Sequence, residues 1–239
     1  MRSVRTRGVI LLLMLGWAAS ARGQTIMLQP GPEGADVAPY QFLPETFRGL
    51  NESLWAFTDP DDAHGFRTFL RFDLPADLLA PDERIASALL VLLFDREIGF
   101  GMSADDGPGL LECRPALAAW SEMAVTWGSQ PAFGDPVDTI DGITEFGDVA
   151  CDVTELVADW AAGVVPNHGF AVTNPTGRLI GFPSFESVID GAPDPKRPRL
   201  LIKVVPAPEP GVAAGIAAAG VTLTLLASRR RQGRGARPL

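Results

Sequence analysis

The chain has 239 residues, of which 46% are hydrophobic, and a formal net charge of -9. Residues 24–208 hold 28 of the 29 acidic but only 11 of the 20 basic side chains, which gives this part a net charge of -17. A body with this much negative charge repels phosphates, which excludes nucleic acid as a partner. Its length is that of one domain with one core.

Residues 1–23 have the features of a secretory signal peptide. Arg2, Arg5 and Arg7 precede an apolar stretch at 9–17, and small residues follow it. The apolar stretch is too short to span a membrane, and the order of basic, apolar and small residues is that of a cleaved leader. We therefore expect signal peptidase to process an exported chain, whose mature part faces an oxidising compartment.

Short apolar runs bounded by turn residues dominate the body of the chain. They have the length of strands, and many alternate or are rich in β-branched side chains. The runs are residues 25–28, 66–72, 86–94, 109–113, 169–173 and 200–205. This spacing predicts an all-β fold, a single jelly-roll-like β-sandwich over residues 24–205 with one short helix.

An acidic turn precedes the second of these runs. Asp59, Asp61 and Asp62 offer carboxylate oxygens, which are the ligands that calcium prefers. Their spacing is not that of an EF-hand, so a solvated turn is the alternative. Calcium is the one cofactor that the sequence suggests.

Four side chains are candidates for binding carbohydrate. The rings of Tyr40, Trp55 and Trp127 could stack on a sugar, although hydrophobic anchoring of its loop is the alternative for Trp55. Arg67 could pair with a uronate. Arg71 is a weaker candidate of the same kind, because an internal acid could be its partner.

Cys113 and Cys151 are the two cysteines of the chain. An exported chain with an even number of cysteines usually pairs them, and a loop of roughly forty residues closed in this way contributes on the order of 3 to 4 kcal/mol. A metal site is disfavoured, because no further cysteine or nearby histidine completes a tetrahedral set.

The stretch WSEMAVTWGSQP at 120–131 places two tryptophans seven residues apart. Alternation predicts a short strand with Val125 and Trp127 on one face, after a turn beyond Trp120. The ring of Trp120 would then cover an edge of the core. Packing is the preferred interpretation of the pair, and an aromatic platform for a sugar is the alternative.

A helix is predicted after residue 151. Asp152 stands at the cap and Glu155 follows three residues later, as in a capping box, and Gly163 ends the helix. The apolar stripe consists of Val153, Leu156, Val157 and Trp160.

The end of the chain has the features of a membrane anchor. Pro208, Glu209 and Pro210 precede an uncharged stretch at 211–228, which is just long enough to span the hydrocarbon core, and an arginine-rich tail. A buried helix is a poor alternative, because only polar residues follow. Residues 206–239 resemble the PEP-CTERM sorting signal of exported bacterial proteins. The resemblance implies cleavage by an exosortase-type enzyme and transfer from the membrane to the surface or matrix.

Seven segments spread over most of the body occur in a specific order. They are TIMLQPGPEGAD at 25–36, TFLRFDLPADL at 68–78, IASALLVLLF at 85–94, WSEMAVTWGSQPAFG at 120–134, CDVTELVADWAAG at 151–163, NHGFAV at 167–172 and RPRLLIKV at 197–204. In this order they resemble the DNRLRE domain, a β-sandwich module related to alginate-type carbohydrate-binding modules. The chain departs from that pattern at 47–66, where FRGLNESLWAFTDPDDAHGF replaces the usual Asn-Tyr-Gly loop.

Together these features predict an exported, non-catalytic module of the cell surface or matrix that binds or organises extracellular polysaccharide. A structural or adhesive envelope protein without a sugar site is the alternative. A polysaccharide-degrading enzyme is less favoured, because His64 and His168 lie in loops without a nucleophile elbow, and no pair of carboxylates stands out among the acids.

Overall fold

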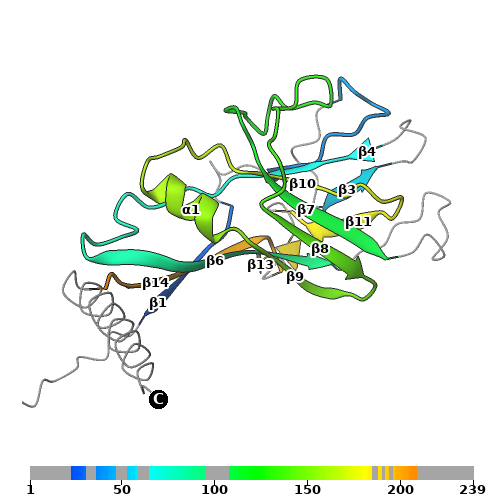
Figure 1. Ribbon diagram of the computed structural model, residues 1–239. Coiled ribbons are helices and arrows are strands. Elements are labelled where there is room, and N and C mark those ends of the chain that lie inside the picture. Colours follow the sequence, from blue (N-terminus) through cyan, green and yellow to red (C-terminus); the bar gives the residue numbers. More distant parts are fainter. Residues whose placement is uncertain are drawn as a thin grey trace, which may run out of the picture.

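The computed structural model describes residues 23–30, 36–46, 53–58, 65–94, 108–184, 188–189, 192–193 and 196–208. Within these ranges the chain forms antiparallel sheets and one α-helix, which confirms the predicted all-β fold (Figure 1). Most of the predicted signal peptide, together with Glu209, Pro210 and the predicted span at 211–228, lies outside them. In the part of the chain that is described, no helix is long and apolar enough to cross a membrane.

The first sheet contains four strands in the order β1-β14-β6-β9. They are β1 (Gln24–Leu28), β6 (Glu83–Phe94), β9 (Gly147–Asp152) and β14 (Arg199–Pro206). In the long strand β6, Leu90, Leu92 and Phe94 are buried together because alternate residues face the same side of a strand. Gln24 pairs with Val204, so the two chain ends of the sandwich lie side by side (Figure 1).

The second sheet contains five strands in the order β2-β5-β10-β7-β8. They are β2 (Asp36–Val37), β5 (Thr68–Leu70), β7 (Gly109–Pro115), β8 (Asp138–Ile143) and β10 (Phe170–Thr173). Strand β10 is buried on both faces: Phe170 and Val172 join the main core, and Ala171 joins a second, smaller core. The second core consists of Val37, Phe69, Ala116, Trp120, Val125 and Ala171.

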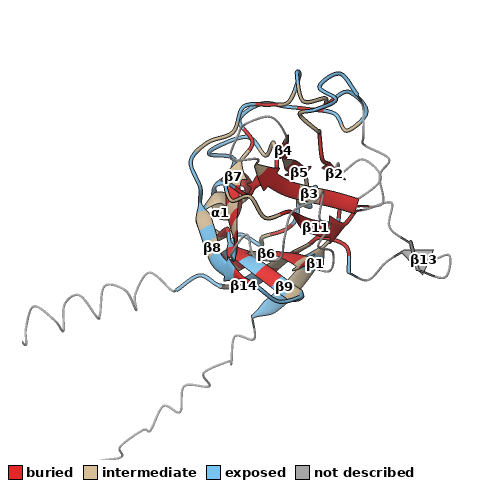
Figure 2. Ribbon diagram, turned by 90° about the vertical axis from the view of Figure 1, so that its right-hand side faces the viewer, coloured by how far each residue is buried: buried red, intermediate tan, exposed pale blue. Residues whose placement is uncertain are grey.

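A third sheet has the order β11-β3-β4, and a separate pair of strands completes the described structure. The strands are β3 (Ser53–Thr58), β4 (Gly65–Phe66), β11 (Ile180–Pro183), β12 (Val188–Ile189) and β13 (Ala192–Pro193). Figure 2 shows how the buried strands, β3 and β11 among them, gather in the middle of the molecule, with exposed segments at the rim.

Each of the six predicted runs contains a strand, although Arg67 separates β4 from β5 within the run at 66–72. The sequence prediction missed the short strands β2, β12 and β13 and the longer strands β3, β8, β9 and β11. Strand β3 lies in the segment that was expected to be a loop, and it is buried on both faces, so its sequence shows no alternation. Strand β8 is polar and largely exposed, so it resembles a loop in sequence.

The predicted disulfide joins Cys113 on β7 to Cys151 on β9. The two Cα atoms are 6.4 Å apart, and both side chains are fully buried in the main core. The bond therefore links the first sheet to the second, which confirms the pairing expected from the sequence.

Helix α1 (Thr154–Ala161) lies beside β6, and its predicted start needs correction. The N-cap is Val153, which forms no side-chain capping bond, so the predicted capping box is wrong. Asp152, one residue earlier, instead accepts hydrogen bonds from the backbone nitrogen and the hydroxyl of Thr154 (3.0 and 2.5 Å). Val153 occupies the cap because its side chain is buried and its N–H binds the carbonyl of Ala88 on β6.

The other end of α1 agrees with the prediction. Gly163 has a φ of 69°, which favours glycine, and its N–H binds the carbonyl of Trp160. The N–H of Val164 binds the carbonyl of Asp159, which completes a Schellman motif. Trp160 is buried with its ring 4.8 Å from that of Phe170.

The predicted strand around Val125 is wrong, because residues 121–130 form turns. Ser129 satisfies this backbone locally: its hydroxyl accepts from the N–H of Thr126 and donates to the carbonyl of Ala124. The prediction for Trp120 is confirmed. Its ring packs in the second core, and its indole N–H donates to the carbonyl of His168 at 2.8 Å.

Replacing both cysteines with alanine should lower the free energy of unfolding by about 3 to 4 kcal/mol, because the unfolded chain regains the entropy of a loop that spans 38 residues. Urea denaturation of the oxidised protein and the double variant measures the difference. Reduced wild type is the control and should unfold close to the variant. Equal stability of the oxidised wild type and the variant would contradict the prediction.

Asp152→Asn should be less stable than the wild type at pH 7, and the two should converge as the pH falls below 3.8. The hydroxyl of Thr154, and then its backbone N–H, hold the pKa of Asp152 below its ordinary value of 3.8. A carboxyl group whose pKa is lower in the folded than in the unfolded protein stabilises the fold at a pH above its unfolded pKa. This stabilisation is lost as the pH falls through the folded pKa. Thermal melts from pH 7 to pH 2 test this, with the exposed Asp73→Asn as control. A difference that persists unchanged at pH 2 rejects the explanation.

Candidate functional site

The four carbohydrate-binding candidates fall into two groups. In the first, Tyr40 and Trp55 both contact Phe66 of β4. The ring of Tyr40 stacks on it with centroids 4.3 Å apart, and the ring of Trp55 meets it edge-on at 6.5 Å. Both residues are partly buried against the main core, so much of each ring is used in packing.

The second group brings Arg67 and Trp127 together. The guanidinium carbon of Arg67 lies 4.4 Å from the centre of the Trp127 ring and 5.3 Å from that of Phe133, distances at which a cation is attracted to an aromatic face. Gly65 lets Trp127 approach, because a methyl group there would lie only 3.2 Å from the outer edge of the indole. Trp127 remains partly exposed.

A second arginine extends this arrangement. Arg114 lies 5.7 Å from the centre of the Phe133 ring. Its guanidinium donates two bonds to one oxygen of Glu112 (2.8 and 3.1 Å) and a third to the carbonyl of Gly134 (2.9 Å). The same oxygen of Glu112 accepts the hydroxyl of Thr173 at 3.0 Å. We call this set the arginine-aromatic surface; it consists of Arg67, Glu112, Arg114, Trp127, Phe133 and Thr173.

The pleat of the second sheet explains why these polar groups meet. Glu112 and Arg114 are two residues apart on β7 and share its outer face, whereas Leu111 and Cys113 face the core. Thr173 of β10 is the cross-strand partner of Glu112. Residues 116–134 return over this face, and a bridge between Ala116 and Phe133 fixes the return.

A shallow hollow of about 190 Å³ opens in this surface. It is lined by Thr58, Arg67, Glu112, Arg114, Phe133, Thr173 and Pro175. Its volume lies below the range of about 300–1,000 Å³ of pockets that enclose a small molecule. The hollow therefore suits one group of a long ligand that runs across the surface.

The sequence interpretation found Arg67 and Trp127 but missed Phe133, Arg114, Glu112 and Thr173. The alternation of Glu112 and Arg114 with two core residues is visible in the sequence of β7 and would have placed both on one outer face. The contact with Phe133 is not readable in this way, because it depends on how the loop after β7 folds back.

The remaining sequence candidates do not belong to this surface as defined by the described residues. Arg71 donates to the carbonyl of Trp120 at 3.0 Å. Asp59, Asp61, Asp62 and His64 lie outside the described residues. Among the residues that the structure describes, no group of three or more His, Cys, Asp or Glu side chains is arranged to hold a metal ion.

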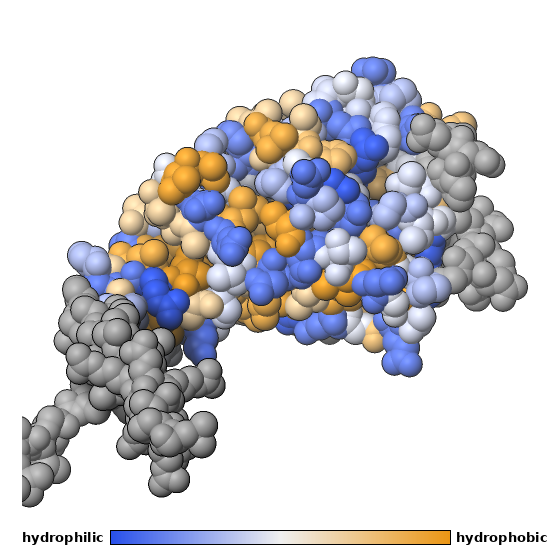
Figure 3. Space-filling view, in the orientation of Figure 1, coloured by the Kyte–Doolittle hydropathy of each residue, from blue (hydrophilic) through white to orange (hydrophobic). Residues whose placement is uncertain are grey.

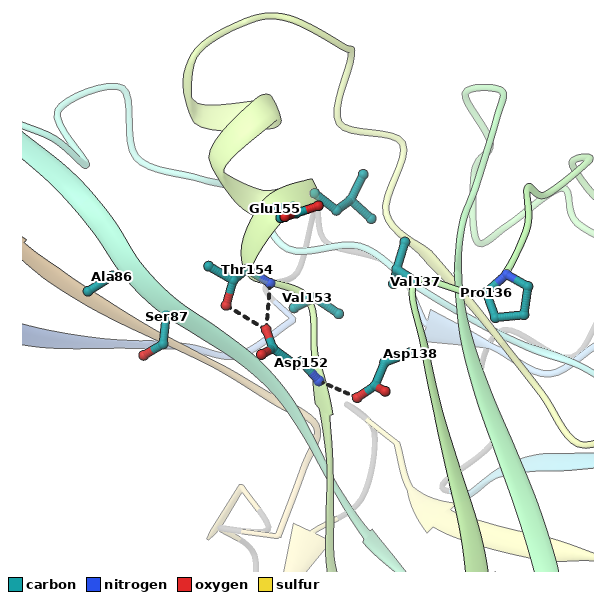
Figure 4. Close-up of a pocket in the computed structure, with 10 residues that line it drawn as sticks. Ala86, Ser87, Pro136, Val137, Asp138, Asp152, Val153, Thr154 and Glu155 are labelled. Atoms are coloured by element: carbon teal, nitrogen blue, oxygen red, sulfur yellow. Dashed lines mark hydrogen bonds between the residues drawn. The ribbon is translucent and has the colours of Figure 1, made fainter. Parts of the chain in front are cut away.

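A larger groove of about 790 Å³ lies on another part of the molecule, beside β6 and the start of α1 (Figure 4). Its lining consists of Ala86, Ser87, Pro136, Val137, Asp138, Asp152, Val153, Thr154, Glu155 and Leu156. It thus has three carboxylates but neither an aromatic ring nor a basic group. The carboxylates of Asp138 and Asp152 bind neighbouring groups of the chain: Asp138 accepts the N–H of Asp152 at 2.7 Å, and Asp152 binds Thr154.

The exposed surface seen in Figure 3 mixes hydrophilic and hydrophobic residues in small patches. Exposed apolar side chains such as Phe42, Leu117, Phe146 and Val164 come from different loops. Scattered apolar residues of this kind are normal on a protein surface and mark no site by themselves.

Comparison with known proteins adds the family. The model of carbohydrate-binding module family 96 matches residues 44–194, more than half of the chain, and this range includes the whole arginine-aromatic surface. No curated protein matches the chain. From the extent of the family match, the chain belongs to carbohydrate-binding module family 96.

Proposed function

We propose that this protein is an exported, non-catalytic module that binds an acidic extracellular polysaccharide through the arginine-aromatic surface. The observation that carries the proposal is the stacking of Arg67 on Trp127 at 4.4 Å beside a shallow hollow, within the range of the family match. The finer resemblance to the DNRLRE domain agrees with this function.

The chemistry of the surface suits a glycan with carboxylates. The planar fork of arginine pairs with a carboxylate through two hydrogen bonds, and an aromatic ring offers an apolar face to a sugar. Thr58 and Thr173 line the same hollow and supply hydroxyl groups. The body carries excess negative charge, but salt screens charges that are more than about 8 to 10 Å apart. The arginines close to the hollow therefore have more effect on the binding of an acidic glycan than distant acidic residues.

The proposed absence of catalysis is supported by the carboxylates of the groove in Figure 4. A glycosidase needs one carboxyl group whose pKa is raised, so that it can donate a proton to the leaving sugar. Thr154 lowers the pKa of Asp152, so this carboxyl group is unsuited to be that proton donor. The groove also lacks the aromatic ring that would hold a sugar in place.

We further propose the route by which the module reaches its place of action. Signal peptidase removes residues 1–23, the sandwich at 24–205 folds outside the cytoplasm, and the segment 206–239 holds it in the membrane. An exosortase-type enzyme then cuts near Pro208, and the module passes to the surface or matrix. The disulfide supports this route, because such bonds persist in oxidising compartments.

Affinity electrophoresis of the full chain in mild detergent tests binding. The gels contain alginate or polygalacturonate as acidic polymers, or hydroxyethylcellulose or laminarin as neutral ones, each with and without calcium. We expect the acidic polymers to retard the wild type. Arg67→Ala and Trp127→Ala should each weaken binding about tenfold or more, as the loss of a central contact does.

Arg84→Ala is the matched control, because Arg84 is exposed on β6 in the other sheet and the variant should bind like the wild type. Retardation that requires calcium would point to ions bridging carboxylates, for which Asp59, Asp61 and Asp62 are the candidates. No retardation by any polymer would favour a structural or adhesive protein. Release of reducing sugar ends would reveal an enzyme.

A further inference from the structure

Glu112 occupies a central position in the arginine-aromatic surface without a sequence pattern that marks it as a ligand-binding residue. One of its oxygens accepts three hydrogen bonds, two from the Arg114 guanidinium and one from the Thr173 hydroxyl. The side chains of Glu112 and Arg114 are only 18% and 20% exposed. This ion pair is therefore mostly shielded from water and is held from two strands, β7 and β10.

We infer that Glu112 is a positioning residue: it acts on the glycan through Arg114, which it holds in the orientation that binding requires. The inference rests on the proposed function of the surface. The inference adds Arg114 as a second arginine that contacts the glycan. It assigns Glu112 the separate role of holding Arg114 in place.

The hydrogen bonds of Arg114 support this division of roles. A guanidinium has five N–H donors in a fixed plane, and three of them are bound to Glu112 and to the carbonyl of Gly134. These bonds leave one N–H on each terminal nitrogen, and Arg114 lines the hollow. A fork held in this way loses little freedom when it binds a carboxylate or a sugar hydroxyl.

The same bonds connect Arg114 to the aromatic part of the surface. Gly134 follows Phe133 directly, and its N–H binds the carbonyl of Pro115 while its own carbonyl binds Arg114. Phe133 thus lies near both guanidiniums, 5.3 Å from Arg67 and 5.7 Å from Arg114. If Arg114 loses its anchor on Glu112, the support of Phe133 and the shape of the hollow change with it.

A purely electrostatic role of Glu112 predicts the opposite effect on binding. A carboxylate beside the hollow repels an acidic glycan, so its removal would then strengthen binding. A direct contact between Glu112 and the glycan would weaken binding on removal whether or not Arg114 is present. The sign of the effect and its dependence on Arg114 therefore separate the three roles.

A double-mutant cycle tests the inference on the full chain, with alginate and polygalacturonate as the probes. Glu112→Ala and Arg114→Ala should each weaken binding about tenfold, the size expected for losing one charge-assisted hydrogen-bonded contact. The double variant should bind as weakly as Arg114→Ala alone, because Glu112 has no effect once its partner is gone. Thr173→Val, which removes one bond to Glu112, should give a smaller loss of about twofold to threefold.

Two controls separate positioning from charge and from folding. Glu145→Ala removes an exposed carboxylate from the β8 to β9 turn and should not change binding. Glu112→Gln keeps an acceptor oxygen in place and should restore most of the binding that alanine loses. Melting temperatures show which variants are folded. If Glu112→Ala does not fold, Glu112→Gln and Thr173→Val still test the positioning role.

Tighter or unchanged binding by folded Glu112→Ala would overturn the positioning role. Losses that multiply in the double variant would assign Glu112 to direct contact with the glycan. If the wild type binds none of the polymers, the proposed function fails and this role fails with it. Normal binding by the wild type and by all Glu112 variants would overturn this role alone.

Discussion

The burial of Trp120 holds the loop between β7 and β8 against the second sheet, and this loop supplies both aromatic rings of the candidate site. The indole ring packs against Phe69, its N–H binds the carbonyl of His168, and its own carbonyl accepts the Arg71 guanidinium. The loop is thereby fixed by one ring contact and two long-range hydrogen bonds. Trp127 and Phe133, which come later in the same loop, are carried to the outer face of the sheet.

The two tryptophans of this loop therefore have different physical roles. Trp120 lies in the second core and organises the backbone, whereas Trp127 belongs to neither core and lies against Arg67. A stacked arginine is partly relieved of its hydration and held in one plane, which prepares it for a planar ligand. Such a surface gains affinity by losing little conformational freedom on binding and not by its area.

The sequence predicted the all-β class, the disulfide and the end of α1 because each rests on local or countable features. Alternation reveals strands with one buried face, cysteine parity favours a pair, and Gly163 suits a left-handed C′ position. Strand β3 could not be found in this way, since both its faces are buried, and the start of α1 shifted because β6 holds Val153. The sequence also suggested Arg67 as a carbohydrate-binding residue. It could not show that Arg67 and Arg114 both lie near the ring of Phe133, because that depends on the tertiary fold.

The position of β14 within the first sheet determines how the sandwich bears mechanical load. It lies between β1 and β6 and pairs with both along most of its length. A force that enters at Pro206 and is resisted at the proposed site on the second sheet runs along this strand. The hydrogen bonds to β1 and β6 are perpendicular to the strand and therefore to this force. They must break together in shear and cannot open one after another. Strand β14 therefore resists a pull on this end of the domain better than a strand paired on one side only.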